Sequence, residues 1–234
     1  MKEWQKRTAM LMGEDSLRIL AFSEVAVFGL GGVGSYAVEA LARAGVGRLT
    51  LVDSDVFEES NINRQLYALP STVGMAKCEV SAKRVSEINP DCVVTPVRRF
   101  ITPENIESFD LGKFDYVLDC IDTVASKIAL AVKCHELGVG IISAMGAGNK
   151  LHPEMFEIAD ISKTSVCPLA KVMRHELKRS GVEHLKVVYS KEIPAKVFVS
   201  AGALGCHSPG SVSFVPSAMG LIMAGEVVRE LCGL

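Results

Sequence analysis

Two cations in neighbouring motifs of this sequence have the types and spacing needed to bind a polyphosphate. The motifs are SNINRQ at residues 60–65 and GMAK at residues 74–77. Arg64 offers paired donors on a planar guanidinium, and Lys77 offers a compact ammonium; both side chains neutralise phosphate oxygens. Asp122, the last residue of a DCID motif, adds a carboxylate that could hold Mg²⁺ on the phosphates. The pattern indicates chemistry at a nucleotide phosphate.

A glycine-rich turn indicates where the nucleotide would bind. The sequence GLGGVG spans residues 29–34, between an apolar run and a helix-forming stretch. Glycines there allow a tight turn and let a phosphate approach the free N–H groups of the next helix. Asp53 follows about 20 residues later, where an acidic side chain binds ribose hydroxyls. The motif indicates a nucleotide without separating NAD from ATP. The predicted glycine contacts are Gly29, Gly31, Gly32 and Gly34.

The two cations favour ATP over NAD. A dinucleotide-binding turn holds its pyrophosphate mainly with backbone N–H groups, so it needs few cationic side chains. Transfer of AMP to a carboxylate brings two anions together and expels pyrophosphate, so fixed positive charges must stabilise the leaving group. Arg64 and Lys77, both expected on helices that face the strand ends, therefore predict an adenylate-forming enzyme that uses ATP and Mg²⁺.

Alternating strands and helices are predicted to position these residues. Strands are expected at residues 24–30, 47–53, 92–98, 116–120 and 139–144. Helices are expected at residues 31–44, 60–69, 75–88, 123–137 and 168–179. Later strands are expected at residues 157–161, 186–189 and 211–215, and a packed amphipathic helix at 218–231. Continuous apolar strands between helices are typical of parallel sheets. We predict an α/β, Rossmann-like, mostly parallel central sheet with helices on both faces and extra C-terminal strands.

The composition is that of an ordinary globular protein. Of 234 residues, 49% are hydrophobic and 22% charged, with a net charge of -2. We expect one domain over residues 1–234: a helical arm at 1–22, a nucleotide-binding core at 23–146, and a substrate-facing and closing segment at 147–234. The apolar C-terminal stretch is too short to span a membrane, so no stable membrane insertion is expected. Seven cysteines without a C-x-x-C pair argue against zinc and for a reducing cytoplasm.

Four motifs taken together resemble the ubiquitin-activating-enzyme-like superfamily (ThiF/MoeB/HesA), whose bacterial members adenylate C-terminal carboxylates of sulfur-carrier proteins. The motifs are GxGGVGS, DxDxxxxSNxNRQ, GxxK and DCxD, and the resemblance covers about residues 7–150. It implies a set of site residues: Asp53 and Asn61 at the ribose of ATP, Arg64, Gln65 and Lys77 at the phosphates, Asp122 at Mg²⁺, and Asp55 as a further nucleotide contact.

The same resemblance assigns a role to the N-terminal arm. Arg7, in RTAMLMG, resembles the arginine that members of the superfamily insert into the active site of a partner subunit. That role implies a homodimer and makes Arg7 a catalytic residue. The alternative is a solvated charge on a helix.

The second half of the chain resembles the tRNA threonylcarbamoyladenosine dehydratase branch of the superfamily. The residues that carry this resemblance are GAGNKLHPE at 146–154, DISKTSVCPLA at 160–170 and RHELKR at 174–179. It implies that ATP is used to adenylate the carboxylate of the modified adenosine next to the anticodon of a tRNA, and that internal attack then closes a ring. The alternative is an adenylyltransferase for the C-terminal carboxylate of a ubiquitin-like sulfur-carrier protein. Whether a sulfur-transfer protein assists stays open.

Further polar residues of the second half have two interpretations each. Cys167 precedes Pro168 at a predicted helix N-terminus, where a thiolate is stabilised, so it is a candidate nucleophile or only a weak cap. His152 and His207 are candidates for proton transfer or exposed loop residues. A basic group could face tRNA or form a solvated helix face with i,i+4 pairs. Its members are Lys163, Lys171, Arg174, Lys178, Arg179, Lys186, Lys191 and Lys196.

Overall fold

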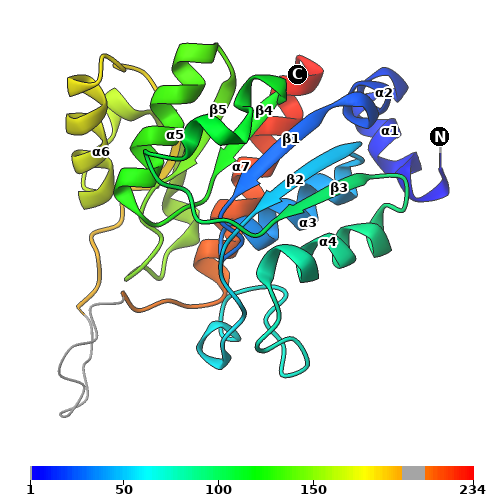
Figure 1. The fold of residues 1–234 in the computed structure, drawn as a ribbon, viewed down its shortest axis with the longest axis horizontal. Helices are drawn as coiled ribbons and strands as arrows, with labels where there is room; N and C mark the ends of the chain where they lie inside the picture. Colours follow the sequence, from blue (N-terminus) through cyan, green and yellow to red (C-terminus); the bar gives the residue numbers. More distant parts are fainter. Residues whose placement is uncertain (1, 197–208) are drawn as a thin grey trace.

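A seven-stranded sheet forms the centre of the protein (Figure 1). The computed structural model describes residues 2–196 and 209–234, so His207 and Cys206 lie outside the described residues. The strand order is β3-β2-β1-β4-β5-β7-β6, and β6 is antiparallel to β7 whereas the other pairs are parallel. The strands are β1 (Glu24–Phe28), β2 (Arg48–Val52), β3 (Val93–Val97), β4 (Tyr116–Asp119), β5 (Gly140–Ala144), β6 (Phe156–Asp160) and β7 (Lys186–Ser190). The predicted Rossmann-like sheet is confirmed.

Helices cover both faces of this sheet. The α-helices are α1 (Lys6–Met12), α2 (Glu14–Phe22), α3 (Gly34–Ala44), α4 (Lys77–Ile88), α5 (Val124–Leu137), α6 (Pro168–Arg179) and α7 (Phe214–Cys232). The short 3₁₀ turns are η1 (Glu3–Gln5), η2 (Glu59–Asn61), η3 (Ile106–Phe109), η4 (Leu111–Lys113), η5 (Pro153–Met155) and η6 (Ile161–Lys163). No helix in the described part of the chain combines the length and the hydropathy of a transmembrane span.

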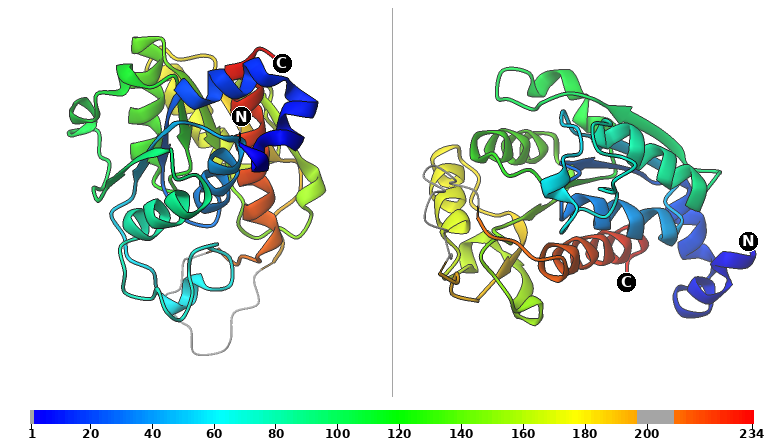
Figure 2. Two further views of the ribbon diagram at one scale, coloured as in Figure 1. Left: turned by 90° about the vertical axis from the view of Figure 1, so that its right-hand side faces the viewer. Right: turned by 90° about the horizontal axis from the view of Figure 1, so that it is seen from below.

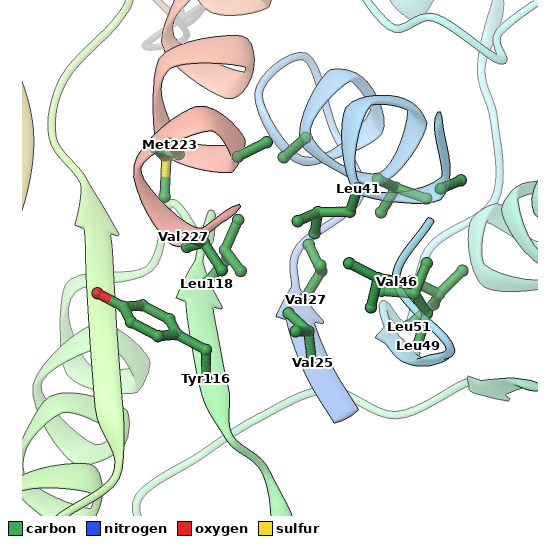
Figure 3. Packing of buried hydrophobic residues seen from close by; sticks show 14 of the residues in the cluster. Val25, Val27, Leu41, Val46, Leu49, Leu51, Tyr116, Leu118, Met223 and Val227 are labelled. Atoms are coloured by element: carbon green, nitrogen blue, oxygen red, sulfur yellow. The ribbon is translucent and has the colours of Figure 1, made fainter. Parts of the chain in front are cut away.

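Side chains alternate between the two faces of the strands, so a single strand contributes to hydrophobic clusters on both sides of the sheet. Val25 and Val27 of β1 pack with residues of α3, α4 and α7 on one face (Figure 3). Ala26 and Phe28 pack on the other face with α5, η3 and η4. On the first face α3 and α7 lie side by side (Figure 2). Their close approach requires Gly220, because a Cβ there would lie 2.2 Å from the Val33 carbonyl oxygen.

The N-terminal arm is helical and lies at the amino end of β2. It consists of η1, α1 and α2, and it bends at Gly13, whose φ is +82°. The Leu20 carbonyl accepts the Gly47 N–H at 2.9 Å just before β2 begins. Gly47 is needed there, since a Cβ would lie 1.8 Å from the Ala21 oxygen. The arm therefore lies at the amino ends of the strands, opposite the end at which their carboxyl termini lie.

Two expected elements are wrong. Residues 60–69 do not form a helix: only η2 and irregular turns are present, which bury Tyr67 in a small cluster with Phe57 and Ala68. Local side-chain bonds, such as the Asn61 Oδ1 that accepts the Glu58 N–H at 3.2 Å, compete there with helix formation. Residues 211–215 do not form a strand either. Helix α7 begins at Phe214 and packs on α3, and Pro216 lies in its first turn, where a proline is compatible with a helix.

Candidate nucleotide-binding site

A cavity of about 960 Å³ opens at the carboxyl ends of the strands. It lies where β1 and β4 are neighbours and the chain order reverses, the position at which open α/β sheets bind ligands. The walls come from the glycine turn, the segments after β2, β3, β4 and β5, and the start of α7. The polar lining residues used below are Asp53, Asp55, Arg64, Gln65, Lys77, Arg99, Asp122 and Ser211.

Glycines shape the floor of the cavity because no side chain fits at two positions. Gly29 has φ +88°, and a Cβ there would lie 2.6 Å from the Cys120 oxygen. A Cβ at Gly34 would lie 1.8 Å from the Gly29 oxygen. The turn therefore leads directly into α3, whose first N–H groups favour an anion. Gly29, Gly31 and Gly32 line the floor, whereas the predicted contact Gly34, at the start of α3, is not among the lining residues.

Asp53 lies beside this turn and is held by backbone donors. Its Oδ2 accepts the Leu30 N–H at 2.7 Å, and its Oδ1 accepts the Asp55 N–H at 2.9 Å. Burial raises the pKa of the Asp53 carboxyl above the ordinary value, although these two donors and Lys77 oppose the increase. A carboxylate oriented in this way at the end of β2 can accept hydrogen bonds from ribose hydroxyls.

Lys77 is the first residue of α4 and reaches the cavity from a buried position. Lys77 is 6% exposed. Its Nζ lies 3.1 Å from Oδ2 of Asp55, whose side chain is exposed. The Lys77 N–H also donates to the Asp55 carbonyl at 3.0 Å. An ammonium at a helix N-terminus combines two positive contributions, which suits a phosphate group.

Arg64 lies in the turns after η2 instead of on the expected helix, yet it lines the cavity. Its stem passes over the glycine turn, since a Cβ at Gly32 would lie 3.4 Å from Arg64 Cγ. Nη1 donates to the Ser60 carbonyl at 2.9 Å and to Asn63 Oδ1 at 2.8 Å. The two predicted cations therefore line the same cavity, although Arg64 comes from the turns after η2 and Lys77 from the start of α4.

Gln65 provides a direct sign that this cavity receives a polar ligand. The residue is 6% exposed and lines the cavity, and its Oε1 is buried with no hydrogen-bond partner among the residues that the structure describes. Buried polar atoms are nearly always paired, so an unpaired one at a cavity wall fits a missing ligand. Asn61 is different: it is buried, it caps the Glu58 N–H, and it is not among the lining residues.

Asp122 is exposed at the cavity, and a buried ion pair supports its loop. Lys127 Nζ lies 2.8 Å from Asp119 Oδ2, and both side chains are 0% exposed. Lys127 Nζ also donates to the Ile121 carbonyl at 3.1 Å, and Ser143 Oγ donates to Asp119 at 2.5 Å. Asp119 and Lys127 are therefore placed to hold the loop that carries Asp122, a support that sequence reasoning missed.

Other lining residues were also missed from the sequence. Arg99 and Phe100 follow β3, Gly146 and Gly148 follow β5, and Ser211 precedes α7. Arg99 adds a third cation; its Nη1 donates to Ser108 Oγ at 2.8 Å. The available signal was positional, because every loop at the carboxyl end of a parallel strand opens toward the same edge.

Two predicted catalytic residues are not at this cavity within the chain. Arg7 is exposed on α1, and the arm contacts Gly45 at the far end of α3 through Trp4 and Gln5. The helix separates the arm from the glycine turn by about 16 Å at 1.5 Å per residue. Cys167 is 3% exposed and lies behind Gly146 without lining the cavity. Its nucleophilic role stays a prediction.

A left-handed turn places Cys167 at the N-cap of α6. Val166 has φ +64°, which is strained for a β-branched residue, and the Cys167 N–H donates to the Ser165 carbonyl at 2.6 Å. His152 is exposed, and its Nδ1 lies 2.8 Å from Glu154; this hydrogen bond raises the pKa of the histidine. Neither residue is placed to transfer a proton in the cavity.

Part of the basic group on the second half is already paired. Arg174 donates to the Ile161 and Thr164 carbonyls, Lys186 pairs with Glu226 at 2.7 Å, and Lys191 pairs with Glu157 at 2.7 Å. Arg179 pairs with Glu176 at 3.1 Å. The exposed members without an ion pair in the described residues are Lys163, Lys171, Lys178 and Lys196.

The arrangement fits ATP with a magnesium ion better than a self-contained metal centre. Within residues 2–196 and 209–234, no three histidine, cysteine or carboxylate side chains cluster as ligands. Mg²⁺ in nucleotide sites needs only one or two carboxylates, because phosphates and water complete its shell. Asp122 supplies an accessible carboxylate, and the cations surround the space where a triphosphate would lie.

Comparison with known proteins gives a consistent result. The model of the ThiF family matches residues 5–234. A tRNA threonylcarbamoyladenosine dehydratase of Bacillus subtilis is 44% identical over 236 residues, covering 96% of this chain and 93% of that protein. The dehydratase of Escherichia coli is 43% identical over 178 residues, covering 75% of this chain and 66% of that protein. The crystal structure of the E. coli enzyme with ATP has a TM-score of 0.90 and 34% identity, covering 100% of this chain and 96% of that one. Because the ThiF family model and these relatives match along nearly the whole chain, and the glycine turn and both cations are present, the protein belongs to the ThiF family.

Proposed function

We propose that this chain is an ATP-dependent tRNA threonylcarbamoyladenosine dehydratase. The carboxylate of the modified adenosine attacks the α-phosphorus of ATP, and the bond to pyrophosphate breaks. A nucleophile within the modification then attacks the acyl carbon, the bond to AMP breaks, and a ring closes with loss of a proton. The net change in the nucleoside is the removal of one water.

One observation carries this proposal: Arg64 and Lys77 lie at a cavity floored by the glycine turn. Their charges oppose the negative charge that grows on pyrophosphate as it leaves. Similarity to dehydratases over nearly the whole chain supports the tRNA substrate over a carrier protein. Since a cavity of about 960 Å³ is at the upper end of small-molecule sites, it offers space for an acyl group beside ATP.

The mass of the modified nucleoside tests the proposal. Total tRNA from cells with and without the gene is digested to nucleosides, and the mass of the threonylcarbamoyl adenosine is measured by mass spectrometry. We expect it to be about 18 Da lighter when the enzyme is present, because adenylation turns a carboxylate oxygen into a leaving group. An unchanged mass excludes the tRNA assignment. Pyrophosphate release with a carrier protein would then support the alternative activity.

Magnesium and tRNA complete the proposed site. Mg²⁺ would be held by Asp122 together with phosphate oxygens, where it neutralises charge on the triphosphate. The exposed Lys163, Lys171 and Lys178, near and on α6, would contact the tRNA backbone.

A sulfur-transfer protein stays an additional candidate partner. A single domain over 1–234 and a cytoplasmic location belong to the same proposal, supported by one continuous sheet and by unpaired cysteines in the described residues.

We further propose a homodimer in which Arg7 enters the site of the partner subunit. The arm carries exposed apolar side chains, with Met10, Leu11 and Phe22 at 87%, 88% and 77% exposure, which suits burial against a second copy. The distance between Arg7 and the glycine turn within one chain supports transfer between subunits.

Mixing two inactive variants tests this exchange. Arg7→Ala and Lys77→Ala are each expected to be inactive alone. After co-refolding, a mixed dimer has one site with both Lys77 and an Arg7 from the other copy, so about a quarter of wild-type activity should return. An Arg18→Ala variant on the same arm is the matched control and should stay active. Absence of any recovery would contradict a shared site.

A further inference from the structure

The guanidinium of Arg64 is held in place by neighbours before any ligand binds. Nη1 donates to the Ser60 carbonyl at 2.9 Å and to Asn63 Oδ1 at 2.8 Å. An arginine side chain loses rotamer freedom when it is fixed, and that loss opposes binding. Anchors that fix it beforehand remove part of that loss from the reaction. The carboxamide of Asn63 is the side-chain anchor.

The other end of the same carboxamide reaches a distant part of the chain. Asn63 Nδ2 donates to the Ser211 carbonyl at 3.0 Å, across 148 residues of sequence. Chemistry determines the orientation of the amide, because a guanidinium only donates and a carbonyl only accepts. Asn63 is exposed and does not line the cavity, so core packing does not explain this bridge.

The residues just before Ser211 are also held by the segment that follows β5. Asn149 Oδ1 accepts the Gly210 N–H at 2.7 Å, and the Asn149 N–H donates to the Gly210 carbonyl at 2.8 Å. Gly148 lies against this segment, since a Cβ there would be 2.7 Å from Pro209 Cβ. Asn63 and Asn149 thus contact residues 210 and 211 from two separate segments of the chain.

We propose that Asn63 is a positioning residue that sets the guanidinium of Arg64 relative to the segment at Ser211, which lines the same cavity. This inference rests on the proposed adenylate-forming function. Asn63 acts through Arg64, because it is itself outside the lining of the cavity. Misplacement of a catalytic group by 1 Å can cost about 10²-fold in rate. Loss of the bridge should therefore lower kcat more than it changes the KM for ATP.

A double-mutant cycle on pyrophosphate release tests the coupling. Asn63→Ala should lower kcat by about 10- to 100-fold with the KM for ATP within about threefold of wild type. In an Arg64→Ala background the same change should have almost no further effect, since the residue it positions is gone. A merely structural role predicts an equal loss in both backgrounds, and that result would overturn the proposal. Ser86→Ala, whose hydroxyl bonds locally to the Ala82 carbonyl on α4, is the control and should match wild type.

Hydrogen exchange provides a second readout that needs no tRNA. Asn63→Asp keeps an acceptor for Arg64 but removes the donor to Ser211, so amides over residues 211–215 should exchange several-fold faster than in wild type. The Ser86→Ala control should leave them unchanged. If the wild type releases no pyrophosphate, the proposed function is wrong. Hydrogen exchange then still tests whether Asn63 holds the segment at Ser211. Unchanged exchange in both Asn63 variants would overturn it.

Discussion

Replacing Lys77 with alanine should lower ATP-dependent pyrophosphate release by about 10²- to 10³-fold, the usual loss when one pre-positioned donor to a developing charge is removed. Lys77 is buried at the start of α4, where its ammonium adds to the positive helix end. Water cannot substitute efficiently for a fixed cation at a buried position. Arg64→Ala should cause a loss of the same order, because its guanidinium serves the same leaving group.

The control for this prediction is on the same helix. Lys83 of α4 is exposed, so Lys83→Ala should keep pyrophosphate release at the wild-type rate. Release is measured with saturating ATP and tRNA substrate, and folding of each variant is checked by circular dichroism. If Lys77→Ala releases pyrophosphate within about threefold of wild type, the electrostatic account of this site is wrong.

Replacing Lys127 with methionine should reduce the free energy of unfolding by about 3–5 kcal/mol, because it leaves Asp119 as a buried charge without its partner. Both side chains are fully buried beside the loop that carries Asp122. Restoring balance with Asp119→Asn in the Lys127→Met protein should recover most of the loss, since a neutral pair carries no uncompensated charge. Urea unfolding measures all three proteins.

A partly exposed lysine of the same helix, whose side chain is 19% exposed, is the comparison. Lys133 of α5 pairs with Glu107 at 2.7 Å, and that glutamate is 72% exposed. Lys133→Met should cost only about 0–1 kcal/mol, as exposed ion pairs do. A loss at Lys127 no larger than the loss at Lys133 would show that the buried pair does not support the fold.

Local residue order was sufficient to predict the sheet, the nucleotide turn and the two cations. Mostly apolar runs marked β1, β2, β4 and β5, since strands buried on both faces are predominantly hydrophobic. The glycines were predictable because Gly29 and Gly34 leave no room for a side chain. Types and spacing of charged residues carried the rest of the prediction, because phosphate chemistry limits which side chains can serve it.

Folding in three dimensions was needed for everything that depends on a distant neighbour. Residues 60–69 look helical in isolation, but burial of Tyr67 and local side-chain bonds impose turns that still bring Arg64 to the cavity. The stretch before Pro216 looks extended, but close packing of α7 on α3 makes it the start of a helix. The Asn63–Ser211 bridge spans 148 residues. The hydrophobic periodicity of the sequence cannot predict such a pair, because a hydrogen bond between separate segments depends on where the sheet places the ends of those segments.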